Sequence, residues 1–151
     1  MQNANINKIE IKDVANFKVG IVKAQFNGDI TDAVLEDSKN CLKKYGIEEN
    51  IDIFTVFGSV EIPVILKTLA DSNKYDLLIA IGAIIKGETD HYDFVAKLVC
   101  DGTLQVMMEN KIPIGFAVLT TPNKKLAEDR INIGTEAVEA ALNNASIIKN
   151  I

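Results

Sequence analysis

Apolar runs of strand length alternate with segments of helical periodicity along the chain. The runs at 17–24, 51–57, 76–85 and 114–119 have the length and bulk of buried strands. Between and after them, apolar residues recur at helical spacing near 30–45, 60–72, 91–108 and 124–148, and Gly46 is placed to end the first of these segments. The pattern predicts four strands that alternate with four helices.

The third apolar run contains the sequence LLIAIGAII, which is typical of a strand covered on both faces. Strands that alternate with helices join through right-handed parallel crossovers. We therefore predict an α/β fold, namely a flavodoxin-like, doubly wound, parallel four-stranded sheet in a three-layer αβα arrangement. Such folds bind ligands at the carboxyl ends of the strands, so candidate site residues are expected in the loops that begin at Gln25, Phe57, Ile84 and Thr120.

The first 16 residues precede this complete domain. Residues 8–12 (KIEIK) alternate polar and apolar side chains like a strand, yet they have no partner in the predicted sheet. We predict an N-terminal arm over 1–16 and a single domain over 17–151. The arm is either a strand added to a neighbouring subunit's sheet or a frayed terminus.

Composition and charge narrow the classes of partner. The chain has 16 basic and 21 acidic residues, a net charge of -5, and lysines scattered rather than gathered in one stripe, which argues against nucleic-acid binding. Neither a signal peptide nor a stretch of membrane-spanning length is recognisable, so we expect a cytoplasmic protein without a membrane partner. Cys41 and Cys100 lack metal-ligand spacing, and we expect both to be buried small hydrophobes.

The loop after the third predicted strand is the most informative one. It reads GAIIKGETDHYD over 82–93. Gly87 permits a sharp turn, and Thr89 or Asp90 can cap the next helix, whose first backbone N–H groups would face an anion. His91, the chain's only histidine, follows this predicted phosphate site, where an imidazole is suited to proton transfer. The alternative for His91 is a solvated helix start.

Four further residues have both a functional and a structural interpretation. Phe26 lies in a polar loop, where its ring could stack on a planar ligand. Glu61 is either a substrate ligand or a charge that favours a helix N-terminus, and Phe116 is either a stacking residue or part of the core. Arg130, the only arginine, either binds phosphate in a bidentate manner or forms a salt bridge with Glu128 or Asp129 on a helix surface. These immediate neighbours point around the helix from Arg130, so they are poor partners.

Taken together, these loops resemble the lumazine synthase family. The matching motifs are an aromatic-Asn pair after the first strand, G-x-x-E-I-P after the second and G-x-x-I-[RK]-G-x-T-x-H-[FY]-[DE] after the third, and the resemblance covers about residues 17–142. It implies an enzyme of riboflavin biosynthesis that condenses 5-amino-6-(D-ribitylamino)uracil with 3,4-dihydroxy-2-butanone 4-phosphate. The implied products are 6,7-dimethyl-8-ribityllumazine, phosphate and water, with no cofactor and no metal required.

The resemblance also implies a role for each matching residue. His91 would be the catalytic residue, assisting imine formation and phosphate elimination, and Phe26 would stack on the pyrimidine. Glu88, through its backbone N–H, and Arg130 would bind phosphate, while Phe116 would reach the site from an adjacent subunit. The implied substrate-binding residues are Phe26, Asn27, Ser59, Val60, Glu61, Ala83, Ile84, Ile85, Glu88, Thr89, Phe116 and Arg130.

Members of this family are homo-oligomers built from pentamers, and some assemble further into decamers or icosahedral 60-subunit shells. The present sequence departs from the family pattern at several positions. Gln25 stands where many members have Arg, Phe57 where Pro is usual and Val60 where an aromatic is usual. The segment after Arg130 lacks a Gly/Lys-rich insertion, so the lysine contacts of that insertion do not transfer to this chain.

Three alternatives stay open at this point. An archaeal-type riboflavin synthase shares the architecture but lacks the loop and histidine pattern of residues 87–91. A non-catalytic member that binds lumazine or flavin, or forms shells, would be compatible with Val60 and the shortened segment. A generic flavodoxin-like binding module predicts none of the ordered motifs.

Overall fold

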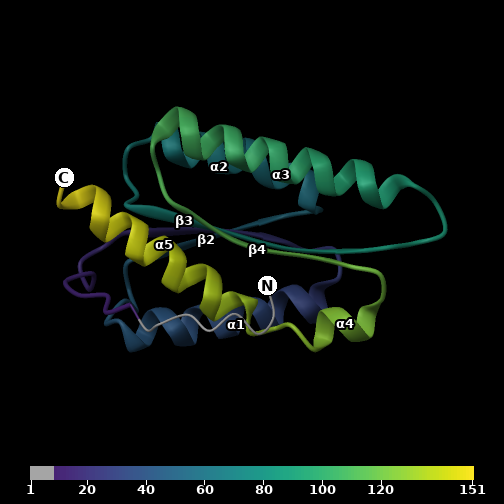
Figure 1. Cartoon of the computed structure of the whole chain (residues 1–151), viewed down its shortest axis with the longest axis horizontal. Coiled ribbons are helices and arrows are strands. Elements are labelled where there is room, and N and C mark those ends of the chain that lie inside the picture. Colours follow the sequence, from purple (N-terminus) through teal and green to yellow (C-terminus); the bar gives the residue numbers. More distant parts are fainter. Residues whose placement is uncertain (1–8) are drawn as a thin grey trace.

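The computed structural model describes residues 9–151 and shows a central sheet between two layers of helices (Figure 1). Strands β1 (Val19–Ala24), β2 (Ile51–Val56), β3 (Leu77–Ile85) and β4 (Ile114–Thr121) pair in parallel in the order β2-β1-β3-β4. Helices α1 (Gly28–Lys44), α4 (Lys124–Glu128) and α5 (Ile133–Lys149) cover one face, whereas α2 (Ile62–Asp71) and α3 (His91–Asn110) cover the other. The prediction of a doubly wound, three-layer parallel sheet is confirmed.

Each face of the sheet has its own hydrophobic cluster. Successive side chains of a strand point to opposite faces, so Ile21 packs with α1 and α5 while Val22 packs with α2 and α3. Strands β1 and β3 are buried almost along their whole length because helices cover them on both faces. Strand β2 lies at an edge, where Ile53 and Phe54 are exposed.

Helix and strand bounds agree with the predictions to within about two residues, except at the C-terminal end. Gly46 ends α1 with a φ of 83°, as predicted. The single helix predicted over 124–148 is wrong, because residues 129–132 divide it into α4 and α5. A contact with helix α1 stabilises the start of α5. The backbone N–H of Thr135, in the first turn of α5, donates to Asp37 Oδ2 of α1 at 2.6 Å, so Asp37 is the acceptor for an N–H group that would otherwise be unpaired.

The two cysteines differ in environment. Cys41 is buried between α1 and α5, and that burial raises the pKa of its thiol to about 11. Cys100 is exposed on α3, so the prediction that both cysteines are buried is wrong for this one. The reason is that α3 turns Val99 towards the sheet and leaves its outer side without cover in the single chain.

The end of the predicted arm packs on the α1/α5 face of the domain. Val14 of the arm is buried there beside Phe17, the first residue of the predicted domain, and Ile11 lies against the same cluster. Residues 9–12 form no strand within the single chain, and Lys8 lies outside the described residues. Pairing of 8–12 with a neighbouring subunit, and the boundary between arm and domain, stay predictions.

Lys23 is a charged residue buried inside β1. Its side chain donates to Asp32 Oδ1 at 2.5 Å, and Lys23 is 5% exposed whereas the Asp32 side chain is 62% exposed. We expect Asp32→Asn to lower the free energy of unfolding by about 1–3 kcal/mol, since it leaves a buried cation without its counter-charge. Lys23→Met should change stability much less, because it removes the buried charge and retains the volume.

Thermal unfolding of both variants at one fixed protein concentration measures this difference. Equal unfolding temperatures for Asp32→Asn and the unsubstituted chain would mean that water already solvates the Lys23 ammonium group.

Candidate functional site

A cavity of about 370 Å³, called here the main cavity, opens at the carboxyl ends of β1, β2 and β3. Strands β1 and β3 are neighbours in the sheet. After β1 the chain continues to one face of the sheet and after β3 to the other, and ligands of such folds bind at this switch point. The main cavity brings together most of the residues predicted for the site, namely Phe26, Asn27, Ser59, Val60, Glu61, Ala83, Ile84, Ile85, Thr89 and His91.

The turn after β1 contains two of these residues, of which one is held by a hydrogen bond and the other is exposed. Asn27 has a left-handed backbone conformation, with φ 57°, and its side-chain Nδ2 donates to the carbonyl of Ala83 at 2.7 Å. This bond ties the end of β1 to the end of β3. Phe26 is 71% exposed beside the cavity, so it is free to contact a ligand and is not a core residue.

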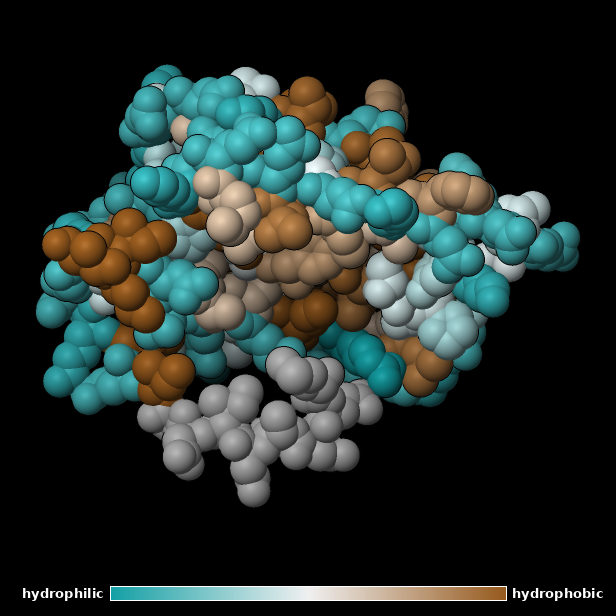
Figure 2. All heavy atoms as spheres, turned by 45° about the horizontal axis from the view of Figure 1, so that its top comes forward, coloured by the Kyte–Doolittle hydropathy of each residue, from teal (hydrophilic) through white to brown (hydrophobic). Residues whose placement is uncertain are grey.

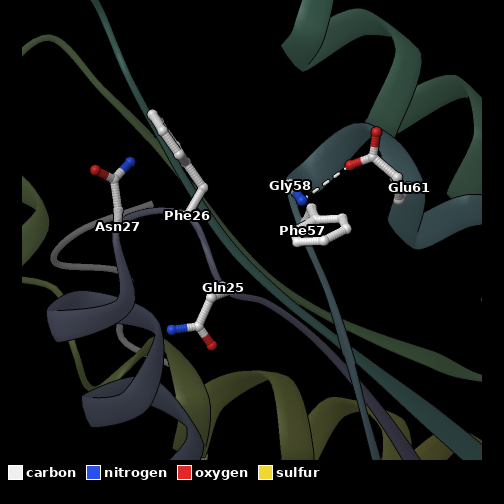
Figure 3. A pocket seen from close by; sticks show the side chains of 6 residues that line it. All are labelled: Gln25, Phe26, Asn27, Phe57, Gly58 and Glu61. Carbon is white, nitrogen blue, oxygen red and sulfur yellow. Dashed lines mark hydrogen bonds between the residues drawn. The ribbon is translucent and has the colours of Figure 1, made fainter.

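The turn after β2 is held by Glu61. Its Oε2 accepts a hydrogen bond from the backbone N–H of Gly58 at 2.9 Å, which closes the short 3-10 turn Ser59–Glu61 (Figure 3). A side chain at Gly82 would place its Cβ 2.5 Å from Ser59 Oγ, so the missing side chain lets this turn pack against β3. The structure therefore gives the Glu61 carboxylate a local role in shaping the cavity wall.

His91 is the first residue of α3 and lines the main cavity. Its backbone N–H donates to Thr89 Oγ1 at 3.3 Å, so Thr89 contributes to the start of the helix as predicted. Asp90 occupies the N-cap position, but its side chain makes no capping hydrogen bond. The N-terminus of a 20-residue helix thus lies at the cavity, where unpaired N–H groups and the helix dipole favour an anion.

Three predicted residues do not line the main cavity. Glu88 lies between the lining residues Gly87 and Thr89 without being one of them. Phe116 is on β4 and packs against the hydrophobic cluster under α2 and α3. In the single chain it is therefore part of the core, as the structural interpretation of this residue predicted. Arg130 lies between α4 and α5, where its Nη1 donates to the carbonyl of Leu126 at 3.0 Å. In a single chain, neither Phe116 nor Arg130 is part of the cavity.

The structure adds four lining residues that were not predicted to bind substrate. Tyr92 and Val95 line the cavity from α3, and Gly58 and Gly87, for which the sequence predicted at most a turn or a motif position, line it from the loops. Helical spacing was the available signal for Val95, since it follows His91 by four residues and side chains at that spacing share a helix face.

The main cavity combines three kinds of group. The aromatic ring and amide at its β1 side suit a planar polar heterocycle. The backbone N–H groups at the start of α3 suit a phosphate, and the imidazole of His91 can transfer protons close to them. Across residues 9–151, no group of three or more His, Cys, Asp or Glu side chains is arranged to hold a metal ion. The cavity therefore combines groups suited to a planar polar ring, to a phosphate and to proton transfer.

Comparison with known proteins gives a consistent result. A family model described as 6,7-dimethyl-8-ribityllumazine synthase matches residues 16–149. A protein of that name from Prochlorococcus marinus subsp. pastoris is 40% identical over 148 residues, covering 92% of this chain and 94% of the relative. Another protein of that name, from Clostridium kluyveri, is 42% identical over 140 residues, covering 89% of this chain and 91% of the relative.

Proposed function

Because the chain belongs to the 6,7-dimethyl-8-ribityllumazine synthase family, we propose that it condenses 5-amino-6-(D-ribitylamino)uracil with 3,4-dihydroxy-2-butanone 4-phosphate. The products are 6,7-dimethyl-8-ribityllumazine, phosphate and water. The observation that carries the proposal is the main cavity, which joins Phe26, Asn27 and His91 at a helix N-terminus. A cytoplasmic location and independence from cofactors and metals are part of the proposal.

In the proposed reaction, the 5-amino group of the pyrimidine attacks the carbonyl carbon of the butanone phosphate. One water leaves as the imine forms, and phosphate is then eliminated. The ribityl-bearing nitrogen of the pyrimidine attacks the remaining carbonyl carbon, and loss of a second water closes the new ring. His91 transfers protons in these steps. Phe26 stacks on the pyrimidine while the turn 59–61 and the β3 end 83–85 surround the uracil and ribityl groups. Holding two reactants in the right geometry lowers a barrier by roughly 7–11 kcal/mol in favourable systems.

Backbone N–H groups of the loop at Glu88 and Thr89, together with the start of α3, bind the phosphate in this proposal. Glu88 takes part through its N–H, because an anionic side chain would repel the substrate. The non-catalytic alternative is disfavoured, since the related proteins carry the name of the enzyme and His91 lies at the cavity.

The decisive experiment mixes the two substrates with the purified chain, without added cofactor or metal. Product absorbance and released phosphate are followed together. Equal appearance of both would support the proposed reaction. Tight pyrimidine binding without turnover would overturn it in favour of the non-catalytic alternative and would make Val60 the first residue to examine.

We further propose a homo-oligomer built from pentamers, in which Phe116 and Arg130 of a neighbouring copy complete each site. Neither residue lines the cavity of its own chain. The outer side of α3 exposes four large apolar side chains within about a third of the helix circumference, and α2 adds another. These residues are Phe94, Leu98, Leu104 and Met108 on α3 and Val64 on α2.

Hydrophobic side chains interrupt the hydrophilic surface on the side covered by α2 and α3 (Figure 2). A second copy that covered them would remove this apolar area from water.

Within the described residues, no helix combines the length and apolar character needed to cross a membrane.

Replacing Arg130 by alanine should raise the KM for the butanone phosphate by roughly 10- to 100-fold, because charge-assisted hydrogen bonds to phosphate are lost. The KM for the pyrimidine should change little, and Arg130→Lys should recover only part of the loss. Lys125→Ala is the matched control, since Lys125 is an exposed cation of the same segment that pairs with Asp129. Equal KM values for Arg130→Ala and Lys125→Ala would contradict a phosphate role for Arg130.

A further inference from the structure

Phe57 is an unusual residue to find at the surface. It follows the last residue of β2 and is 89% exposed, although a phenyl ring is a large apolar group. It lines an open hollow of about 550 Å³, called here the outer hollow, together with Gln25 and four residues shared with the main cavity. The shared residues are Phe26, Asn27, Gly58 and Glu61, so the outer hollow continues the main cavity.

Backbone hydrogen bonds fix Phe57 relative to the other side of the outer hollow. The N–H of Gln25 donates to the carbonyl of Val56 at 2.7 Å, and the N–H of Phe26 donates to the carbonyl of Phe57 at 2.8 Å. These bonds continue the β1–β2 ladder past the ends of both strands. Phe26 and Phe57 therefore stand on neighbouring strand ends, with Asn27 beyond one ring and Glu61 beyond the other (Figure 3).

The charge of the outer hollow discriminates between the two substrates. The six residues that line it include no cation, and Glu61 contributes a carboxylate. The nearby ammonium group of Lys23 is buried and paired with Asp32. A phosphate ester is therefore disfavoured there, whereas a neutral planar ring can contact the aromatic faces.

We infer that Phe57 is a specificity-determining residue that contacts the pyrimidine substrate beside Phe26. This inference rests on the proposed function, because it takes the pyrimidine to occupy the main cavity. Val60 faces the main cavity with a short aliphatic side chain, so it cannot supply a second aromatic face. Phe57, which precedes Val60 by three residues, supplies the second aromatic face at the mouth of the site.

The test compares Phe57→Ala and Phe57→Leu with the unsubstituted chain. We expect Phe57→Ala to weaken pyrimidine binding about twofold to tenfold, with the KM for the butanone phosphate unchanged within about twofold. Phe57→Leu should recover only part of the affinity, since it restores apolar area without a ring. Phe54→Ala is the matched control, because Phe54 is an exposed phenylalanine of β2 that lines neither the outer hollow nor the main cavity.

Direct binding of the pyrimidine alone, measured by calorimetry, separates this inference from the proposed function. Turnover of the unsubstituted chain tests the function, and the ratio of pyrimidine affinities tests Phe57. Equal affinity in Phe57→Ala and Phe54→Ala would overturn the inference. Loss of assembly in sedimentation, with both substrates affected equally, would also overturn it and would assign Phe57 to a subunit interface.

Discussion

Replacing His91 by alanine is expected to lower kcat by about 10²- to 10⁴-fold while leaving assembly intact. This range is typical of removing a positioned general acid or base. His91 is exposed at the first turn of α3, so its removal leaves the core unchanged. Binding of the pyrimidine should persist, because Phe26, the turn 59–61 and the β3 end are untouched. Steady-state kinetics and sedimentation of the purified variant measure both parts of this prediction.

Lys97→Ala provides a control on the same helix. Lys97 is exposed and paired with Asp101 one turn away, and it does not line the cavity. Added imidazole should restore part of the activity of His91→Ala if the missing function is proton transfer. A kcat for His91→Ala within about threefold of the control would assign His91 to the solvated helix start and would leave the proton-transfer residue unidentified.

The sheet and its layers were predictable because burial on both faces leaves a continuous apolar pattern. Strand β3 is the strongest example, since eight of its nine residues are buried. The break between α4 and α5 was not predictable in the same way. It depends on α1, where a Cβ at Gly134 would lie 2.7 Å from the carbonyl of Val34, and Asp37 binds the backbone N–H of Thr135. Such a long-range contact leaves no local mark at residues 129–132.

The candidate site was predictable to the extent that strand ends define it. The loops after β1, β2 and β3 meet at the main cavity, as expected for a doubly wound sheet. The positions of Phe116 and Arg130 could not be predicted from one chain in the same way, because neither residue lies at the cavity of its own chain. Residues supplied by a second copy depend on symmetry, which periodicity along one chain does not reveal.

The proposed sharing of sites between copies leads to the second large expected effect. His91→Ala and Arg130→Ala should each be nearly inactive at limiting butanone phosphate, yet assemblies formed from equal amounts of both should recover about a quarter of the wild-type activity. Each site in a closed ring would take His91 from one copy and Arg130 from the next, so random mixing leaves about one site in four with both residues. Co-expression of two differently tagged chains, followed by purification on both tags, provides the mixed assembly.

The matched control combines His91→Ala with Phe26→Ala. Both residues line the cavity of one chain, so every site in that mixture lacks one of them and no activity should return. Recovery in the first mixture and none in the second would mean that each site uses His91 of one copy and Arg130 of another. Absence of recovery in both mixtures would contradict the shared site, because Arg130 would then act in the same chain as His91. Recovery in both would mean that Phe26→Ala does not disable a site, and Phe26 would lose its assigned role.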